Sequence, residues 1–306
     1  MQNSIPNLFL IGGMRCGSTA LHLLLDQHDD INMSLNKEPG FFNAELKRQK
    51  LSNNYSKELE EDLNSYVKKG KYRTTDKYIS LFDNSTKYKY RGESSHYIHS
   101  SDTATIIKKE SPQSKIIISV RNPIERLYSE FCLYERRQDS LSHNFDSYVN
   151  KIIKIHKGNK PTILTKGLYF DSLSHWIKIF GEDNVKIIVY EEFKEDQQKV
   201  LSEIYDWLNL SDLRITNLKP QKTGKIRFKK LFFFINSSGF IKNSLKYIFS
   251  KNTRIKIRSI FYGLFIKNKE KSCISMETRK KLINFYKSDI LDLEQYLCQD
   301  LSNWFV

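Results

Sequence analysis

Residues 7–25, NLFLIGGMRCGSTALHLLL, constrain the fold more than any other part of the chain. A short apolar run over residues 7–11 ends in two glycines, and leucines at helical spacing follow over residues 19–28. This order predicts a buried strand, a glycine turn and a helix. Because the helix carries the chain back to the edge where the strand began, the next strand can pair with the first in parallel.

The alternation of strand and helix continues to about residue 210. Apolar, largely β-branched runs predict buried strands over residues 115–120 and 185–190, and the short segment 31–33 is a further candidate. Apolar side chains at helical spacing predict further helices over residues 123–134, 167–180, 197–208 and 277–297, and another is expected near 56–68. The chain is therefore predicted to have an α/β fold, with a parallel central β-sheet flanked by helices on both faces.

We expect a single domain over residues 1–306. An α/β core would occupy residues 1–210, and a basic, mainly helical part over residues 211–306 would pack on it. Within that part, residues 225–267 interleave cations with Phe, Tyr and Ile. Two interpretations stay open for this stretch: buried helices whose Lys and Arg side chains reach outward, or a surface that lies on anionic lipid.

The charge balance favours anionic partners. The chain has 50 Lys and Arg residues against 35 Asp and Glu residues, which leaves a net charge of +15. This charge suits nucleotides, acidic glycans, nucleic acid or a membrane surface, and it does not choose among them. The four cysteines are far apart, so neither a metal site nor a disulfide framework is expected. With no signal-peptide pattern and no apolar run of about 18 residues, we expect a cytoplasmic location.

The glycine turn almost matches the phosphate-binding loop of nucleotide hydrolases, G-x-x-x-x-G-K-[ST] (the P-loop). Residues 12–19 read GGMRCGST, so Ser18 replaces the lysine and a different cation, Arg15, lies inside the loop. The loop amides and the positive end of the following helix still favour an anion, but loss of the lysine argues against ordinary ATP chemistry. On these residues alone, a structural turn with a surface arginine is an equally good interpretation. Cys16, near a helix N-terminus, is expected to have a lowered thiol pKa and to act as a spacer.

A second motif spans residues 116–129, which read IIISVRNPIERLYS. Arg121 lies at the carboxyl end of the predicted strand, and Ser129 follows two helical turns later. A charged fork and a hydroxyl placed in this way can grip one phosphate. Arg126 is expected on the same helix face as Ser129. Three residues favour a helix start here: Asn122 as the cap, Pro123 in the first turn, and Glu125 as the partner in a capping box.

Together these motifs resemble those of the sulfotransferases that use 3′-phosphoadenosine 5′-phosphosulfate (PAPS). The loop of that family reads like G-x-x-[KR]-x-G-[ST]-[ST], and its second signature is a strand followed by R-x-P-x-x-R-x-x-S, which residues 121–129 match at every specified position. Further similar stretches are KEPGFF at 37–42, GESSHY at 92–97, GLY at 167–169, VYEEF at 189–193 and LEQYLCQDLSNW at 293–304. The usual proline after Ser95 is replaced by His96. The resemblance covers nearly the whole chain and is weakest over residues 45–90 and 215–272.

The resemblance implies a P-loop-like nucleotide-binding core over residues 1–210 that binds PAPS as a co-substrate, with no metal ion. Arg15 and the loop amides would stabilise the 5′-phosphate and the bridging oxygen. The residues that would supply those amides are Cys16, Gly17, Ser18, Thr19 and Ala20. Arg121 and Ser129 would hold the 3′-phosphate. Sulfuryl transfer resembles phosphoryl transfer, so we expect in-line displacement with charge spread over the peripheral oxygens.

The general base is the harder assignment. In the similar carbohydrate sulfotransferases the glutamate of the K-E-P segment is the base, which implies this role for Glu38 here. The simpler alternative is that Glu38 only forms an ion pair with Lys37 or Arg15. Histidine has an ordinary pKa that suits a base better, so His96 stays a second candidate. Glu93 is expected to orient loop groups rather than to take protons.

The resemblance implies transfer to a hydroxyl or amine, and we expect the acceptor to be a bacterial glycan or glycolipid, with adenosine 3′,5′-bisphosphate (PAP) as the product. No specific nucleic acid partner is expected, and a peripheral contact at the inner membrane face stays open because of residues 225–267. Two other functions remain as alternatives. A P-loop small-molecule kinase would need a lysine at position 18, and a non-enzymatic basic protein would bind nucleic acid or membrane through its charge.

Overall fold

The structure, a computed structural model, describes residues 5–43, 74–83, 87–137, 144–156, 162–214, 224–226, 266–268 and 274–306. The helix expected near residues 56–68 and most of the basic stretch 225–267 lie outside these ranges. The assignment of residues 1–306 to one domain stays a prediction.

Five parallel strands form the central sheet, in the order β2-β3-β1-β4-β5. The strands are β1 (Leu8–Leu10), β2 (Ile31–Met33), β3 (Tyr90–Ser94), β4 (Lys115–Val120) and β5 (Val185–Val189). Four of them were expected from their apolar runs, and β3 was not. Because the chain adds strands first on one side of β1 and then on the other, the order reverses at β1. Open α/β sheets bind their ligands at such a point, outside the carboxyl ends of the strands.

Strand β3 was not predicted from the sequence, because its residues, YRGES, are mostly polar. Two side-chain arrangements let this sequence lie inside the sheet. Gly92 leaves room for the neighbouring strand, since a Cβ there would lie 2.1 Å from the sulfur of Met33. Glu93 is fully buried and accepts hydrogen bonds from hydroxyl groups, as described below. Backbone pairing and local partners therefore replace apolar burial as the reason for this strand.

Helices cover both faces of the sheet, as predicted. Side chains alternate along β1, so Leu8 and Leu10 face one side while Phe9 and Ile11 face the other. The first side packs against α1 (Ser18–Leu25) and α10 (Gln197–Trp207). The second side packs against α5 (Ser101–Glu110) and α8 (Phe170–Phe180). Each face thus has its own apolar core, and the sheet between them is buried.

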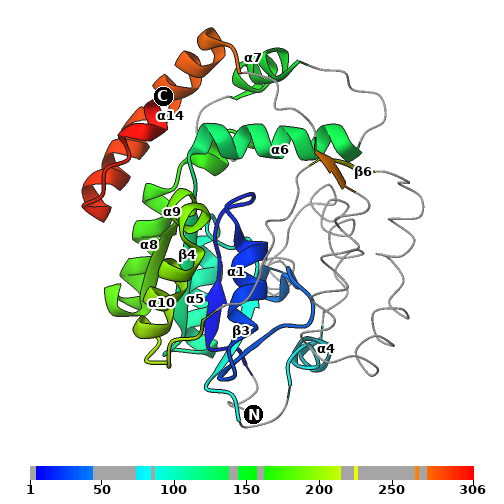
Figure 1. The fold of residues 1–306 in the computed structure, drawn as a ribbon, viewed down its shortest axis with the longest axis vertical. Helices are drawn as coiled ribbons and strands as arrows, with labels where there is room; N and C mark the ends of the chain where they lie inside the picture. The colour runs from blue at the N-terminus through cyan, green and yellow to red at the C-terminus, as the bar shows by residue number, and fades with distance from the viewer. Residues whose placement is uncertain are drawn as a thin grey trace, which may run out of the picture.

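A further layer of helices extends the second core. Helix α14 (Met276–Leu297) contacts α6 (Pro123–Arg137), α7 (Phe145–Ile155) and α8, and Figure 1 shows it along the outer edge of the molecule in orange to red. Its predicted apolar stripe is buried at Leu282, Tyr286, Ile290 and Leu293. The part after residue 210 also contains an antiparallel strand pair that the sequence did not predict, β6 (Gly224–Ile226) with β7 (Ile266–Asn268).

Among the described residues, the remaining α-helices are α4 (Thr75–Ile79) and α9 (Tyr190–Glu195). None of the helices within the described ranges is long and apolar enough to cross a membrane.

Candidate functional site

The loop between β1 and α1 starts in close contact with β4. Gly13 N–H donates to the carbonyl of Ser119 at 3.0 Å, and a Cβ on Gly12 would lie 2.6 Å from that same oxygen. Gly17 precedes α1 with φ 85°, a left-handed conformation that glycine adopts without strain. The loop is therefore tight, and it ends at the first turn of α1, whose amide groups have no carbonyl partner within the helix.

The five loop amides predicted to bind the donor divide into two groups. Those of Cys16 and Ala20 donate inside the loop, to Gly13 O at 3.3 Å and to Gly17 O at 2.9 Å. The amides of residues 17–19 are left at the N-terminal end of α1, where the helix dipole favours negative charge. The geometry thus supports a smaller amide set than the sequence predicted.

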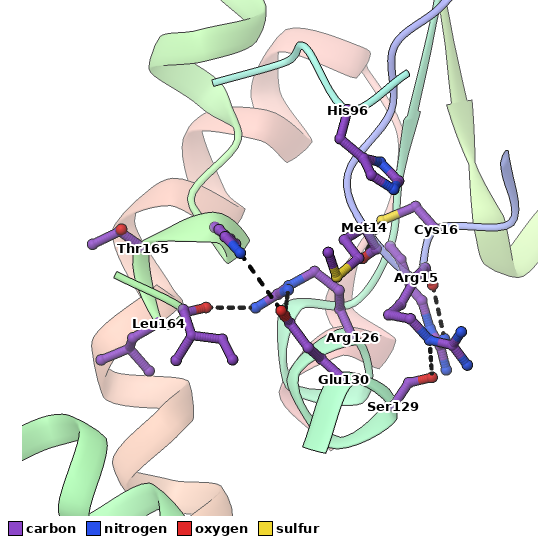
Figure 2. A network of polar contacts seen from close by, with 12 residues as sticks. Met14, Arg15, Cys16, His96, Arg126, Ser129, Glu130, Leu164 and Thr165 are labelled. Atoms are coloured by element: carbon purple, nitrogen blue, oxygen red, sulfur yellow. Dashed lines mark hydrogen bonds and ion pairs between the residues drawn. The ribbon is translucent and has the colours of Figure 1, made fainter. Parts of the chain in front are cut away.

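Three residues from distant parts of the chain meet at this loop. Arg15 Nε donates to Ser129 Oγ at 2.9 Å, and Arg121 Nη1 donates to the carbonyl of Arg15 at 3.0 Å. Figure 2 shows Arg15 and Ser129 pointing toward each other. The loop, the end of β4 and helix α6 are thereby joined, so the predicted binding residues lie in one place. The side chain of Arg15 lies beside Ser129, and its predicted role at the bridging oxygen stays a prediction.

The structure adds Tyr190 to this group. The guanidinium carbon of Arg121 lies 4.6 Å from the centre of the Tyr190 ring, which is a cation–π distance. A Cβ on Gly17 would lie 2.6 Å from the same ring, so Tyr190 packs directly against the loop. Tyr190 comes directly after β5, the neighbour of β4, and that position at a strand end is the sequence signal that could have identified it.

The start of α6 agrees with one prediction and corrects another. Asn122 caps the helix, because its Oδ1 accepts from Ile124 N at 3.0 Å and from Glu125 N at 3.3 Å. The predicted capping box does not form. Asn122 N–H donates to Glu191 at 3.3 Å, and Glu125 instead lies 3.3 Å from Arg279 on α14. A residue from a neighbouring element thus takes the place of the local partner.

Glu38 lies in the segment after β2 and is in contact with the side chains of Lys37 and His96. Its Oε1 accepts from Lys37 Nζ at 2.5 Å and lies 3.0 Å from His96 Nε2. These contacts, with the hydrogen bond from His96 first, hold the pKa of the carboxyl well below its ordinary value although partial burial opposes them. The side chain is half exposed, so an acceptor can reach it. Both candidate bases of the sequence analysis therefore lie in contact with each other.

Two residues of the site have left-handed backbone that is uncommon outside glycine. Arg15 has φ 71° and Glu38 has φ 60°. Such a conformation costs about 1–2 kcal/mol for a residue with a Cβ. It aims each side chain in a direction that a regular turn would not give.

The buried carboxylate of Glu93 is connected to the Glu38 segment through Ser95. Glu93 accepts hydrogen bonds from Ser95 at 2.6 Å, from Tyr97 at 2.5 Å and from Tyr78. Ser95 Oγ in turn accepts from the amide of Gly40 at 3.3 Å, two residues after Glu38. The geometry agrees with the predicted orienting role of Glu93. Burial raises the pKa of this carboxyl, and the hydroxyl donors oppose that rise.

The prediction for the Cys16 thiol is wrong. The residue is fully buried beneath the loop, with its sulfur 3.7 Å from Tyr169 Oη. Burial raises the thiol pKa to about 11, and nearby Arg126 and Arg121 lower it by less. Desolvation therefore outweighs the effect of the helix terminus.

Arg126 also differs from its predicted place. It is fully buried, and it bonds to Glu130 at 2.5 Å and to the carbonyl of Ile163 at 2.8 Å. Figure 2 shows it directed toward Leu164, away from the Arg15–Ser129 contact. Arg126 thus fixes α6 to residues 162–168 and does not join Ser129 at the site.

Comparisons with known proteins show which family the chain resembles. A model of the sulfotransferase family matches residues 6–213. The chain is 26% identical to a bifunctional heparan sulfate N-deacetylase/N-sulfotransferase 1 of Caenorhabditis briggsae, over 69% of this chain and 23% of the relative. It is 22% identical to carbohydrate sulfotransferase 15 of Mus musculus, over 68% of this chain and 44% of the relative. The chain thus spans less than half the length of these two relatives.

A solved sulfotransferase structure has a similar fold. The crystal structure of a sulfotransferase from Alicyclobacillus acidocaldarius superposes with a TM-score of 0.64 at 23% identity, over 98% of each chain. The family match covers well over half of the chain and includes the glycine loop, Arg121, Ser129 and Glu38. On this evidence, the chain belongs to the sulfotransferase family.

Proposed function

We propose that the protein transfers the sulfuryl group of PAPS to a hydroxyl or amine of a glycan or glycolipid by in-line displacement, with Glu38 as general base. One observation carries the proposal. Arg15 binds Ser129 while Arg121 binds the carbonyl of Arg15, so the glycine loop, the end of β4 and helix α6 are held together where we propose that the donor binds. A donor with a phosphate at each end suits such a site better than a nucleotide with one phosphate chain.

The residues present fit the two ends of PAPS. The amides of residues 17–19 would bind the 5′-phosphate, and glycine at position 17 leaves room for the Tyr190 ring beside them. Arg121 and Ser129 supply a guanidinium and a hydroxyl for the 3′-phosphate. PAPS brings the activated sulfuryl group, and the chain's own residues bind, orient and take up the proton of the acceptor.

The glycan acceptor is proposed from the relatives, whose names refer to heparan sulfate and carbohydrate sulfation. Glu38 supports it, because a half-exposed carboxylate after β2 can reach a hydroxyl or amine on a large substrate. General-base assistance of this kind contributes about 10²–10⁴-fold to a rate. Glu38→Gln should therefore lower kcat by that order while the donor KM changes little. Full turnover in Glu38→Gln together with loss in His96→Ala would make the base assignment wrong.

Thermal unfolding with PAP tests the donor site. At a concentration of about 100 Kd, PAP should stabilise the fold by about 2.7 kcal/mol, with or without Mg²⁺. Arg121→Ala should remove most of this protection, because it removes the guanidinium that we propose binds the 3′-phosphate. Arg214→Ala is the matched control, since Arg214 is exposed and carries the same charge. Stabilisation by ATP with Mg²⁺ and none by PAP would overturn the proposal.

A further inference from the structure

His96 connects the two halves of the proposed site. It follows β3, and its ring lies between the segment after β2 and the loop after β1. Nε2 lies 3.0 Å from Glu38 Oε1, and Nδ1 lies 3.2 Å from the carbonyl oxygen of Gly12. A single side chain thus contacts both the proposed base and the loop proposed to bind the donor.

These two partners define what the ring can do. A carbonyl oxygen only accepts hydrogen bonds, so the contact with Gly12 requires the proton on Nδ1. Nε2 then faces the Glu38 carboxylate with a lone pair in the neutral ring, or with a second proton in the charged ring. The backbone therefore selects the tautomer that leaves Nε2 ready to take a proton from the carboxyl group.

We propose that Glu38 and His96 act as one base, in which Glu38 takes the proton of the acceptor and passes it to Nε2 of His96. The inference rests on the proposed sulfuryl transfer and deepens it. The acceptor oxygen or nitrogen forms a bond to sulfur while the bond from sulfur to the 5′-phosphate oxygen breaks, and that electron pair stays on the phosphate. The acceptor proton ends on His96, and the pair changes from a net charge of −1 to zero.

Such a relay resolves a weakness of Glu38 as a lone base. The contacts with His96 and Lys37 hold the pKa of Glu38 low, so a proton left on the carboxyl group would be unstable. On Nε2 the same proton forms a charged hydrogen bond to the restored carboxylate. Once His96 is already protonated, the pair has no place for the incoming proton. The neutral ring is therefore the active form.

The surroundings favour return of the proton to water. The three segments that meet here carry Lys37 beside Glu38, Arg15 in the loop, and both Arg91 and the buried Glu93 in β3. Lys37 binds the same oxygen as His96 and opposes a lasting positive charge on the ring. The His96 side chain is 27% exposed, so solvent can accept the proton directly.

The dependence of kcat on pH tests the relay. Glutamine at position 96 keeps an amide donor for Glu38 but has no site for a proton. In the wild type, kcat should rise with pH in one step that belongs to the pair. His96→Gln should lower kcat by about 10²–10⁴-fold, flatten that step and leave the donor KM within about twofold. His175→Gln is the matched control, because His175 also contacts a carbonyl, that of Ser101, but is not part of the site.

The results for His96→Gln and for the wild type test the relay and the proposed function separately. If His96→Gln kept both the rate and the pH step of the wild type, the relay would be wrong and the ring would only orient Glu38. If the wild type transferred no sulfuryl group from PAPS to any glycan, the proposed function would fail and the relay with it.

Nitrogen NMR of the imidazole rings gives a readout that needs no turnover. The His96 signals, identified by their loss in His96→Gln, should show Nδ1 protonated at every pH and Nε2 gaining its proton as the pH falls. A neutral ring protonated at Nε2 would overturn the proposal.

Discussion

Cys16 illustrates at the scale of single residues how burial overrides local position. The residue stands one position before the N-cap of α1, where a helix dipole would promote the thiolate. Its side chain is nevertheless enclosed between the loop and Tyr169, and the thiol pKa rises to about 11. Sequence spacing shows the helix terminus but not the enclosure.

This difference predicts selective alkylation. With iodoacetamide at pH 8, exposed Cys298 should react in the folded protein while buried Cys16 stays unmodified. Peptide mass spectrometry over time measures both sites in one sample. In denaturant both should react, which serves as the control for reagent access. Equal rates at the two cysteines in the folded protein would contradict the burial described above.

The sequence allowed us to predict that one place in the fold would bring together Arg15, Arg121 and Ser129. Both motifs that contain them begin at the end of a predicted strand, and strand ends and helix starts carry strong local signals. The contact between Glu38 and His96 could not be predicted in this way. It depends on β2 and β3 being neighbours, and β3 has too few apolar residues to be recognised. Arg126 was misplaced for a related reason, since spacing gives its helix face but not the buried Glu130 that it meets there.

The N-terminus of helix α8 is capped by a side chain from helix α14. Its first amides have no partner inside the helix, and Asp289 on α14 supplies one from outside. The carboxylate accepts from Tyr169 N at 2.8 Å and from Phe170 N at 2.9 Å. Burial raises the pKa of Asp289 to about 6, although these two hydrogen bonds lower it.

The raised pKa predicts a pH-dependent contribution to stability. Because the folded state holds the Asp289 proton more tightly than the unfolded chain, this contribution is complete below about pH 3.8 and is lost as pH rises through about 6. The difference in unfolding free energy between wild type and Asp289→Asn should therefore shrink from pH 4.5 to pH 7.5, as measured by urea unfolding. Glu277→Gln, an exposed change on the same helix, should show no such trend. An equal difference at both pH values would contradict the expectation.

Elements with periodic apolar side chains, such as β4, β5 and α14, were predicted with bounds close to those observed. The order of the strands was not predicted, because pairing across the sheet leaves no local pattern. The β6–β7 pair was missed as well, since the basic residues around it suggested helix or surface.

Charge is unevenly distributed over the whole molecule. Residues 215–273 contain fifteen Lys and Arg residues and a single acidic residue, Glu270, so this stretch carries nearly all of the net charge of +15. Most of it lies outside the described ranges. The charge alone is a reason to propose contact with an anionic surface, because each cation near such a surface contributes about 1 kcal/mol.

Binding to vesicles that contain phosphatidylserine tests this proposal. Affinity should fall steeply as salt rises, since screening shortens the reach of each charge. Changing Lys229, Lys230 and Lys251 to Gln should weaken binding, and the same change at Lys280, Lys281 and Lys287 on α14 is the charge-matched control. Equal losses in the two triple variants would assign the effect to overall charge. Vesicle sedimentation gives the measurement.

The left-handed backbone at Arg15 and Glu38 bears on how this protein would respond to selection for heat resistance alone. Glycine at either position would relieve the backbone, although it would increase the entropy of the unfolded chain, so it would be among the tolerated replacements. Each such replacement would remove the guanidinium or the carboxylate on which the proposed chemistry depends. Replacements selected for thermal stability at these two positions would therefore lower turnover.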